Sequence, residues 1–333
     1  MKENEKYMKE AFLQAKKAYE LDDFQGSLKT AGWLPDSIFE IIDRIKEAHP
    51  MDVLRTALSA LAAFDVDRVD QSREGLLRKG IRLTSQVPMI VAAPHRLRRA
   101  VRAIETEPTL CLAANFLYMV QGERTSEAAA NLMDLDFILH AEHGSNASSF
   151  TARVVTSTGA DLHAAITAAI GALSGPAHGG AAENVMKMAL EIGDPSKAHE
   201  YVKVKRKNRE AIMGFGHRVY RAPDPRARHL RLGVESLSLE KGEPKWSQVL
   251  SALVDAMEPY SRHGVNVNVD FYSGVIYHLH GIPQDLFVPI FAVGRIPGWT
   301  LQVMQQQESN ILIRPLLKYN GPAKRAYIPM ADR

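Results

Sequence analysis

The chain has 333 residues, of which 46% are hydrophobic and 24% charged, and this composition excludes disordered, collagen-like and low-complexity proteins. Its length is near the size at which a single hydrophobic core divides, so we expect two domains. A net charge of +3 suits small anionic ligands and argues against a dedicated nucleic-acid surface. The single cysteine, Cys111, cannot form an internal disulfide, and the chain has neither a run of 18 apolar residues nor a signal-peptide pattern. We therefore expect a cytoplasmic protein.

The dominant periodicity along the chain is helical. Asp36 or Ser37 is suited to cap a helix whose isoleucines follow the i, i+3, i+4, i+7 spacing as far as Ile45, and Asp52 opens the next helix. Further helices are predicted over 73–83, 110–120, 126–140, 161–173, 180–192, 246–260 and 286–307, with glycines and prolines between them. Only 202–205 and 265–269 alternate as strands do, and both are too short to form a sheet alone. We predict a mainly α protein.

Composition changes at Gly175-Pro176 and again near Gly281 to Pro283. The stretch between these points carries the basic run Lys203 to Arg209, which we interpret as a solvated helix face because no aromatic residues are interleaved with it. We therefore expect a small domain, 179–286, inserted into a larger helical domain made of 1–178 and 287–333.

Two residues at predicted helix boundaries are candidates for acid–base chemistry. His178, in Gly-Pro-Ala-His-Gly-Gly, precedes a helix whose N-terminal dipole would keep the imidazole neutral and able to donate a hydrogen bond to a developing oxyanion. The alternative is a loop histidine bonded to backbone carbonyls. Asp270, in Asn-Val-Asp-Phe-Tyr-Ser-Gly, is either the N-cap of a helix or a general base in a partly apolar pocket.

Three solitary arginines stand among apolar residues. In Ala-Pro-Asp-Pro-Arg, the pattern predicts a helix start with Asp224 as the cap and Arg226 in a rigid first turn, where a guanidinium can hold a carboxylate through two hydrogen bonds. Arg295 and Arg314 are similar cases. An exposed surface ion pair is the alternative for each of them.

Two other patterns bear on cofactor binding, one on a dinucleotide site and one on a zinc site. Gly214-Phe215-Gly216 lacks the third glycine and the preceding strand of a dinucleotide fingerprint, but a flexible loop whose amides approach a nucleotide stays open. His140 and His143 are three residues apart, whereas helical zinc proteases place their histidines four apart. We therefore predict no metal site and expect His140 to pack inside a helix.

In combination, four segments resemble the citrate synthase family, in its bacterial and archaeal branch that includes 2-methylcitrate synthases. They are GPAHGG, GFGHRVYR, DPR and NVDFYSG, in that order, and the resemblance runs from about Ala48 to the C-terminus. It implies a two-domain, almost entirely helical homodimer. It also implies condensation of acetyl-CoA or propionyl-CoA with oxaloacetate, followed by thioester hydrolysis to citrate or 2-methylcitrate plus CoA. Acyl-CoA would be a co-substrate, with no metal and no tightly bound cofactor.

The resemblance implies a role for each matching residue. Asp270 is similar to the base that removes the α-proton of the thioester, His178 to the group that stabilises the enolate, and His217 to the group that polarises the oxaloacetate carbonyl. Oxaloacetate binding is implied for His143, Arg226, Arg295 and Arg314, the last supplied across the dimer interface. CoA binding is implied for Met213, Gly214, Phe215, Gly216, Arg221 and Arg96.

The chain departs from the family pattern in several places. It begins later than family members usually do, so we expect an N-terminally shortened member. The family usually has asparagine where Ala182 stands, and commonly arginine at Ile311 and Leu316. A second hypothesis is therefore a repurposed or non-catalytic paralogue that binds CoA and a dicarboxylate without turnover. Neither nucleic acid nor a membrane is an expected partner.

Overall fold

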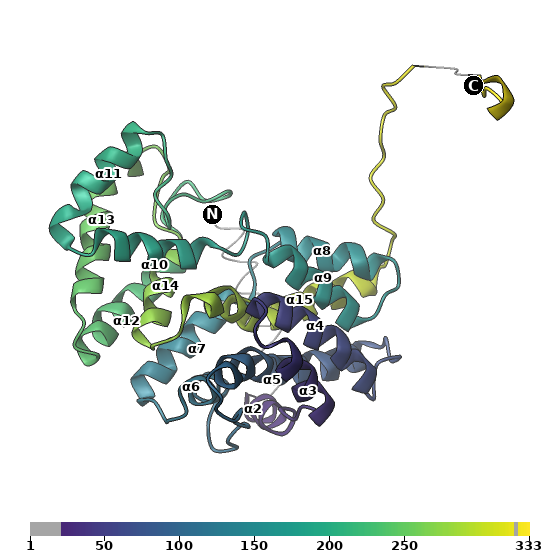
Figure 1. The fold of residues 1–333 in the computed structure, drawn as a ribbon, viewed down its shortest axis with the longest axis horizontal. Helices are drawn as coiled ribbons and strands as arrows, with labels where there is room; N and C mark the ends of the chain where they lie inside the picture. The colour runs from purple at the N-terminus through teal and green to yellow at the C-terminus, as the bar shows by residue number, and fades with distance from the viewer. Residues whose placement is uncertain (1–20, 323–325) are drawn as a thin grey trace.

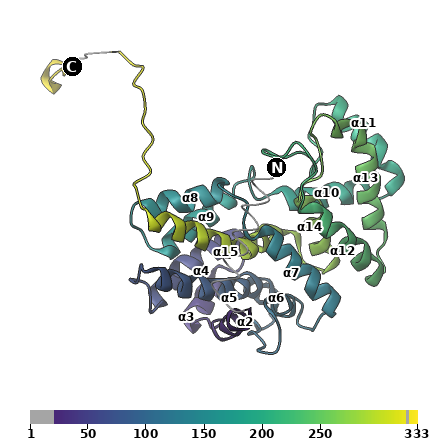
Figure 2. The same ribbon diagram turned by 180° about the vertical axis from the view of Figure 1, so that it is seen from behind.

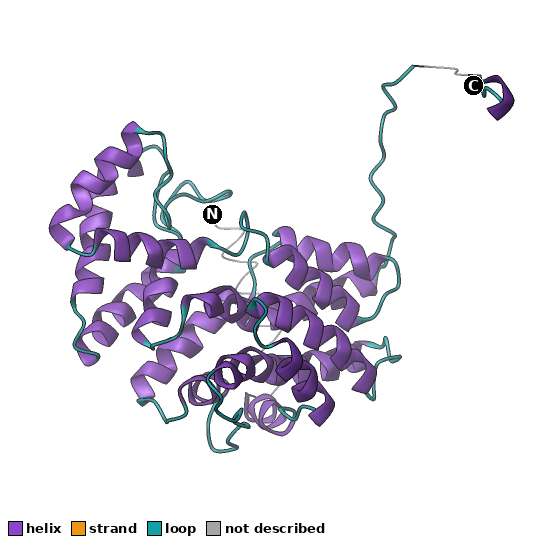
Figure 3. Ribbon diagram, in the orientation of Figure 1, coloured by secondary structure: helices purple, strands orange, loops and turns teal. Residues whose placement is uncertain are grey.

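The computed structural model describes residues 21–322 and 326–333, and this part of the chain is helical without a β-strand (Figure 3). Its only β-like pairing is an isolated antiparallel bridge between Phe215 and Val267. The predicted mainly α class is confirmed. In chain order the helices are α2 (Leu21–Thr30), α3 (Asp36–Ile45), α4 (Pro50–Leu61), α5 (Arg73–Arg98), α6 (Leu112–Gln121), α7 (Glu127–Ala141), α8 (Ala147–Ser157), α9 (Leu162–Leu173), α10 (Ala181–Ile192), α11 (Ala198–Lys207), α12 (Ala227–Glu240), α13 (Lys245–Ser261), α14 (Asp270–Leu279) and α15 (Phe287–Glu308), with short 3₁₀ helices η1 (Ala62–Phe64), η2 (Pro195–Lys197), η3 (Gln284–Leu286) and η4 (Met330–Asp332).

The helices gather in two groups. Seen from either side, α10 to α14 lie together at one end of the molecule, and α2 to α9 lie with α15 in the rest of it (Figure 1, Figure 2). In the first group α14 packs against α10 and α12, and in the second α15 packs against α5, α7, α8 and α9. The assignment of 179–286 as a separate domain stays a prediction.

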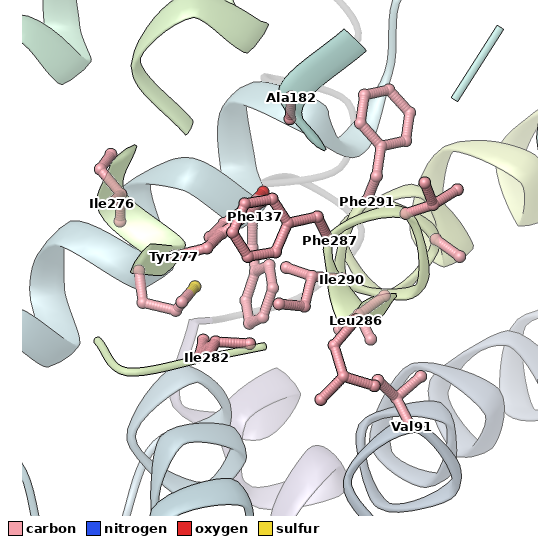
Figure 4. Packing of buried hydrophobic residues seen from close by; sticks show 14 of the residues in the cluster. Val91, Phe137, Ala182, Ile276, Tyr277, Ile282, Leu286, Phe287, Ile290 and Phe291 are labelled. Atoms are coloured by element: carbon pink, nitrogen blue, oxygen red, sulfur yellow. The ribbon is translucent and has the colours of Figure 1, made fainter. Parts of the chain in front are cut away.

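Helix α15 is the central helix of the larger group. Trp299 and Ile296 are fully buried, and Figure 4 shows Phe287, Ile290 and Phe291 from this helix among other core side chains. The segment Gln284–Glu308, which includes α15, is long and apolar enough to cross a membrane, but 83% of its most apolar window is buried inside the protein. Its apolar character is therefore explained by its place in the core.

Several helix boundaries differ from those predicted. Pro35, rather than Asp36 or Ser37, occupies the N-cap position of α3. Helix α4 begins at Pro50 rather than at Asp52, and the His49 ring accepts a hydrogen bond from the Met51 amide, 3.2 Å away. Proline is favoured in the first helical turn because it has no amide hydrogen to leave unpaired there.

Helix α5 is much longer than the predicted 73–83, because it continues through Pro88 and Pro94 to Arg98. Proline inside a helix removes a backbone hydrogen bond and normally argues for a break. Here every residue from Leu83 to Pro94 is buried, so core packing offsets the lost hydrogen bonds.

The two strand-like alternations do not form strands, and one helix was not predicted. The alternation at 202–205 was wrong as a strand signal, since these residues belong to α11, where Ala198 and Val202 are four apart and both buried. The alternation at 265–269 produces only the bridge at Val267. Helix α8 carried no distinct periodicity in the sequence and was missed.

Close packing of α15 against α7 requires a glycine. A β-carbon at Gly298 would lie 1.8 Å from the carbonyl oxygen of Ala141. We expect Gly298→Ala to lower the free energy of unfolding by about 3 kcal/mol, because backbone must move to admit the methyl group. Urea denaturation followed by circular dichroism measures this change.

The matched control is Gly171→Ala in α9, where a β-carbon meets nothing within 4 Å. This substitution should leave stability unchanged or raise it by about 0.5–1 kcal/mol, because alanine is the better helix former. Equal effects of the two substitutions would contradict the proposed close approach.

Candidate active site

Two of the predicted histidines meet between the segment that follows α7 and the loop that contains Gly214 to Tyr220. The ring centroids of His143 and His217 are 5.0 Å apart, with their planes nearly perpendicular. Tyr220 stacks on His217 at 4.5 Å, and its hydroxyl lies 3.0 Å from Nε2 of His143. The tyrosine therefore links the two histidines.

The backbone around His217 determines its tautomer. The amides of Val219 and Tyr220 both donate to Nδ1 of His217 at 3.0 Å. Nδ1 is therefore the unprotonated nitrogen, and Nε2 carries the hydrogen. Burial, reinforced by Arg226, lowers the pKa of His217, so the ring is a neutral donor near pH 7.

His143 is still more strongly disfavoured as a cation. Burial lowers the pKa of His143 to about 3, with further contributions from Arg226 and His217. The ring is therefore neutral throughout the physiological range.

His178 lies in the turn before α10 and contacts the first turn of α8. The Ser148 amide donates to Nε2 of His178 at 3.3 Å, and the Ser148 hydroxyl is 2.9 Å from the same nitrogen. Trp299 of α15 donates to that hydroxyl at 3.1 Å. The Ser148 hydroxyl donates its own hydrogen to Asn146, so the amide contact is the one that favours Nε2 as an acceptor, with the hydrogen on Nδ1. Burial is the main cause of the lowered pKa of His178, followed by Arg295, whereas the helix dipole was the cause expected from the sequence.

Asp270 is the first residue of α14. Val269 occupies the N-cap position and no side chain caps this helix, so the capping interpretation of Asp270 was wrong. Within the described residues no hydrogen bond to the Asp270 carboxylate is found. Burial raises its pKa and Asp136 and Asp224 raise it further, against the opposite effects of His140 and Arg226. An unpaired carboxylate of raised pKa suits a general base.

Arg226 is held by a neighbouring carboxylate. Its Nε and Nη2 donate to the two Asp224 oxygens at 3.1 and 2.7 Å, and both side chains are buried. Asp224 also accepts the Val269 amide at 3.3 Å, which connects this pair to the start of α14. The predicted cap at Asp224 was wrong, because α12 begins only at Ala227 and Arg226 itself occupies the N-cap position.

Arg295 is an almost fully buried cation with spare hydrogen-bonding capacity. The side chain is 2% exposed, its Nε donates to the His140 carbonyl at 2.6 Å, and its guanidinium lies over the Phe291 ring at 4.9 Å. Burial lowers its pKa to about 10, although the nearby Glu142 favours the cation. Nη1 is buried and has no hydrogen-bond partner among the described residues. A buried unpaired donor on a cation indicates a place for an anion.

The Gly214 loop is fixed by the segment that precedes α14. The Gly216 amide donates to the Asn266 carbonyl at 2.7 Å, and the Asn268 amide donates to the Gly214 carbonyl at 2.9 Å. Gly214 has φ of +78°, and a β-carbon there would lie 2.6 Å from Phe271. The predicted CoA-binding residues Met213 to Gly216 thus lie close to the start of the helix that carries Asp270.

Other predicted site residues are not brought to this cluster. Arg314 is exposed in the extended segment that follows α15 and leaves the body of the molecule in Figure 1. Arg221 is exposed on the loop after Tyr220. Arg96, near the end of α5, donates to the Arg102 carbonyl at 2.8 Å and borders a cavity of about 300 Å³ beside Gly122. No contact joins Arg96 to the histidines within the described chain.

Several functional contacts were missed in the sequence. Ser148 and Trp299 act on His178 from 30 or more positions away, and no local signal marks them. Tyr220 stands within the GFGHRVYR segment, so an aromatic residue three positions after His217 was an available signal. Glu142 accepts the His143 amide at 2.9 Å, and its second oxygen is buried without a partner in the described part of the chain.

The predicted absence of a metal site rests on His140 and His143. His140 is buried against Phe291, with ring centroids 4.7 Å apart, and its Nδ1 lies 2.8 Å from the Asp136 carbonyl. Among residues 21–322 and 326–333, no group of three or more histidine, cysteine or acidic side chains is arranged to hold a metal.

The positions that depart from the family pattern lie in two environments. Ala182 is buried in α10, where its carbonyl oxygen would be 2.3 Å from a β-carbon at Gly274 of α14. Ile311 and Leu316 are exposed in the C-terminal segment. Ala182 therefore stands at a close helix contact, and none of the three replaces a group of the histidine cluster.

The family model for "Citrate synthase, C-terminal domain" matches residues 11–316. The chain belongs to the citrate synthase family. The match begins earlier in the chain than the resemblance of the sequence motifs, which starts at about Ala48. Citrate synthase 2 of Bacillus subtilis is 42% identical over 316 residues, which are 94% of this chain and 84% of that protein. 2-Methylcitrate synthase 2 of Corynebacterium glutamicum is 42% identical over 293 residues, which are 86% of this chain and 76% of that protein.

A solved structure of the family has a similar fold. It is the ternary complex of carboxymethyl coenzyme A and oxaloacetate with citrate synthase from Thermoplasma acidophilum. The TM-score is 0.85 at 29% sequence identity, and the match covers 94% of this chain and 84% of that chain. The citrate synthase-like helical fold is thereby confirmed.

The hydrogen bonds to His178 and His217 predict opposite tautomers in this citrate synthase family member. We expect the hydrogen on Nδ1 of His178 and on Nε2 of His217 near pH 7, because backbone amides occupy the other nitrogen in each ring. Long-range ¹H–¹⁵N NMR of protein labelled at histidine distinguishes the two forms. His178→Asn and His217→Asn provide the assignments, and the same tautomer in both rings would refute this geometry.

Proposed function

We propose that this chain is an acyltransferase that condenses an acyl-CoA with oxaloacetate and hydrolyses the thioester to citrate or 2-methylcitrate plus CoA. The observation that carries the proposal is the combination of an unpaired Asp270 carboxylate of raised pKa with neutral histidine donors and a buried, incompletely paired Arg295. The names of the relatives, citrate synthase and 2-methylcitrate synthase, support the same reaction.

The first step is removal of the α-proton of the acyl thioester by Asp270. This proton is weakly acidic, so a carboxylate needs a second group that stabilises the thioester oxygen as negative charge develops. The Nδ1 hydrogen of His178 is suited to donate to that oxygen. A neutral donor serves here because it gains hydrogen-bond strength as the oxygen becomes negative.

Carbon–carbon bond formation follows. The enolate carbon attacks the ketone carbon of oxaloacetate, and the ketone oxygen, polarised by His217, takes the Nε2 proton of that ring as the carbon–carbon bond forms. The α-proton held by Asp270 is then released and His217 is reprotonated, so that both groups return to their starting states. Water then attacks the thioester carbonyl of the condensed product. The bond to sulfur breaks, and CoA leaves as the thiol.

Oxaloacetate brings two carboxylates, which require cationic partners. We assign them to Arg226 and Arg295, with His143 as a further ligand. The Asp224 pairing holds the Arg226 guanidinium in a single orientation, and the free Nη1 of Arg295 is available for a carboxylate oxygen. Arg314 would complete the set from the partner subunit of a homodimer, since it lies outside the cluster of its own chain.

CoA would bind as a co-substrate, with no tightly bound cofactor. We assign its adenine side to Met213 to Gly216 and its phosphates to Arg221, with Arg96 as a further contact.

We propose that 179–286 forms a small domain that closes over the substrates, which would exclude water until condensation has occurred. We propose a cytoplasmic location; the apolar helix α15 is packed in the core and does not call for a membrane.

Substitution of the base tests this function. Oxaloacetate-dependent release of CoA thiol from acetyl-CoA and propionyl-CoA should fall at least ~100-fold in Asp270→Asn, because an amide cannot accept the α-proton. The control is Asp255→Asn, on the exposed surface of α13, which should retain wild-type rates. The faster thioester identifies the product.

Two results would overturn the proposal. One is a folded wild-type protein that binds oxaloacetate without releasing CoA, which would support the non-catalytic paralogue instead. The other is an Asp270→Asn variant with unchanged rates.

The dimer proposal has its own test. Asp270→Asn and Arg314→Met should each be inactive alone. After unfolding and refolding together in equal amounts, they should recover about a quarter of wild-type activity, because a mixed dimer contains one intact site. No recovery in mixtures shown by mass spectrometry to contain mixed dimers would place Arg314 in the site of its own chain, or outside any site.

A further inference from the structure

A buried carboxylate that the reaction does not use lies beneath the proposed base. Asp136, on α7, is 0% exposed. It accepts hydrogen bonds from the Ser273 hydroxyl at 2.7 Å and from the Tyr277 hydroxyl at 2.6 Å, both on α14. Nδ1 of His140, one turn further along α7, lies 3.4 Å from the same carboxylate. Asp136 therefore joins two helices that are far apart in the sequence.

The contacts favour the ionised form of this carboxylate. Burial favours protonation, but His140 and the hydrogen bonds from Tyr277 and Ser273 outweigh it, and the pKa of Asp136 is lowered. Burial and the neighbouring Asp136 raise the pKa of Tyr277 well above its usual value. The Tyr277 hydroxyl is thus protonated and donates its hydrogen bond to Asp136 near neutral pH.

The bonds reach the side of α14 that carries Asp270. Ser273 is three residues and Tyr277 seven residues beyond Asp270, and this spacing places all three on one face of the helix. The hydrogen bonds to Asp136 therefore fix the face of α14 on which the proposed base lies. The helix α7 that supplies Asp136 also leads to His143, and its His140 carbonyl accepts the Nε hydrogen of Arg295. The network therefore connects the base to the proposed oxaloacetate ligands.

Resting on the proposed function, we propose that Asp136 is a positioning residue for Asp270. It fixes the face of α14 through Ser273 and Tyr277, and its buried negative charge strengthens Asp270 as a base.

Several other charged or titratable groups surround Asp270, and each has a partner, a proposed role or an exposed position. Among the described residues, further titratable or charged neighbours of Asp270 are His140 on α7, Asp224 and Arg226 before α12, His217 on the glycine loop, Arg295 on α15 and Tyr277 on α14 itself. His280 near the end of α14 interacts with Asp136. On the helices packed against α14, Glu183 pairs with Lys187 and Arg231 with Glu235 at the surface, and Asp255 is exposed. Asp136 is therefore the buried negative neighbour of Asp270 that no arginine neutralises.

The test is the pH dependence of kcat for condensation in three variants. Asp136→Asn removes the charge but keeps an oxygen that accepts the two hydroxyls. Tyr277→Phe keeps the charge and removes one anchor. Asp134→Asn is the matched control, because Asp134 is on the same helix and has no hydrogen-bond partner among the described residues.

Loss of the charge should let Asp270 ionise more easily. The acid limb of the kcat profile reports that ionisation, so in Asp136→Asn it should move to lower pH, while kcat on the plateau falls about tenfold because the base is weaker. Tyr277→Phe should lower the thermal midpoint without moving the acid limb to lower pH. Asp134→Asn should match the wild type in the acid limb and in kcat, although loss of a partly buried charge can raise its thermal midpoint.

The outcomes separate this inference from the proposed function. A wild-type protein without condensation activity would overturn both. An active wild type with an unmoved acid limb in folded Asp136→Asn would overturn the positioning role alone. If Asp136→Asn does not fold, the inference is tested with Tyr277→Phe instead. A thermal midpoint and a kcat equal to those of the wild type in that variant would show that the network does not hold α14.

Discussion

The cost of placing charge in a protein interior governs the chemistry of this site. The same desolvation acts in opposite directions on different groups: it lowers the pKa of His143, His178 and His217 and raises that of Asp270. The histidines become neutral hydrogen-bond donors and the carboxylate becomes a stronger base. Arg295, which remains a cation despite burial, keeps an unpaired donor. In the proposed reaction, one physical effect thus prepares the base, the neutral hydrogen-bond donors and the anion-binding group together.

Backbone amides determine which nitrogen of each neutral imidazole carries the hydrogen. A neutral imidazole can present its hydrogen on either nitrogen, and only an external contact selects one. The Ser148 amide makes that selection for His178, and the Val219 and Tyr220 amides make it for His217. Because these amides belong to a helix terminus and a fixed loop, the selection requires no titratable partner and is insensitive to pH.

Helix α15 provides the rigid support for these contacts. Its Trp299 bonds to Ser148, its Arg295 bonds to the end of α7, and its Gly298 permits the close approach of α7. Its apolar surroundings make the desolvation of Arg295 possible. A helix that is largely buried in the core thus also positions several groups of the candidate site.

The sequence by itself determined the helical class and most helix positions, because periodicity, glycines and prolines are local signals. Its resemblance to the citrate synthase family supplied the candidate site residues. Local signals also misled: the prolines of α5 predicted an early end, and Asp270 was assigned to capping as readily as to catalysis. Only the tertiary structure decided that Asp224 holds Arg226, that Ser148 and Trp299 orient His178, and that Asp136 lies under Asp270. These contacts join residues that are distant in the chain or depend on burial, and burial is a property of the packed fold rather than of any segment of sequence.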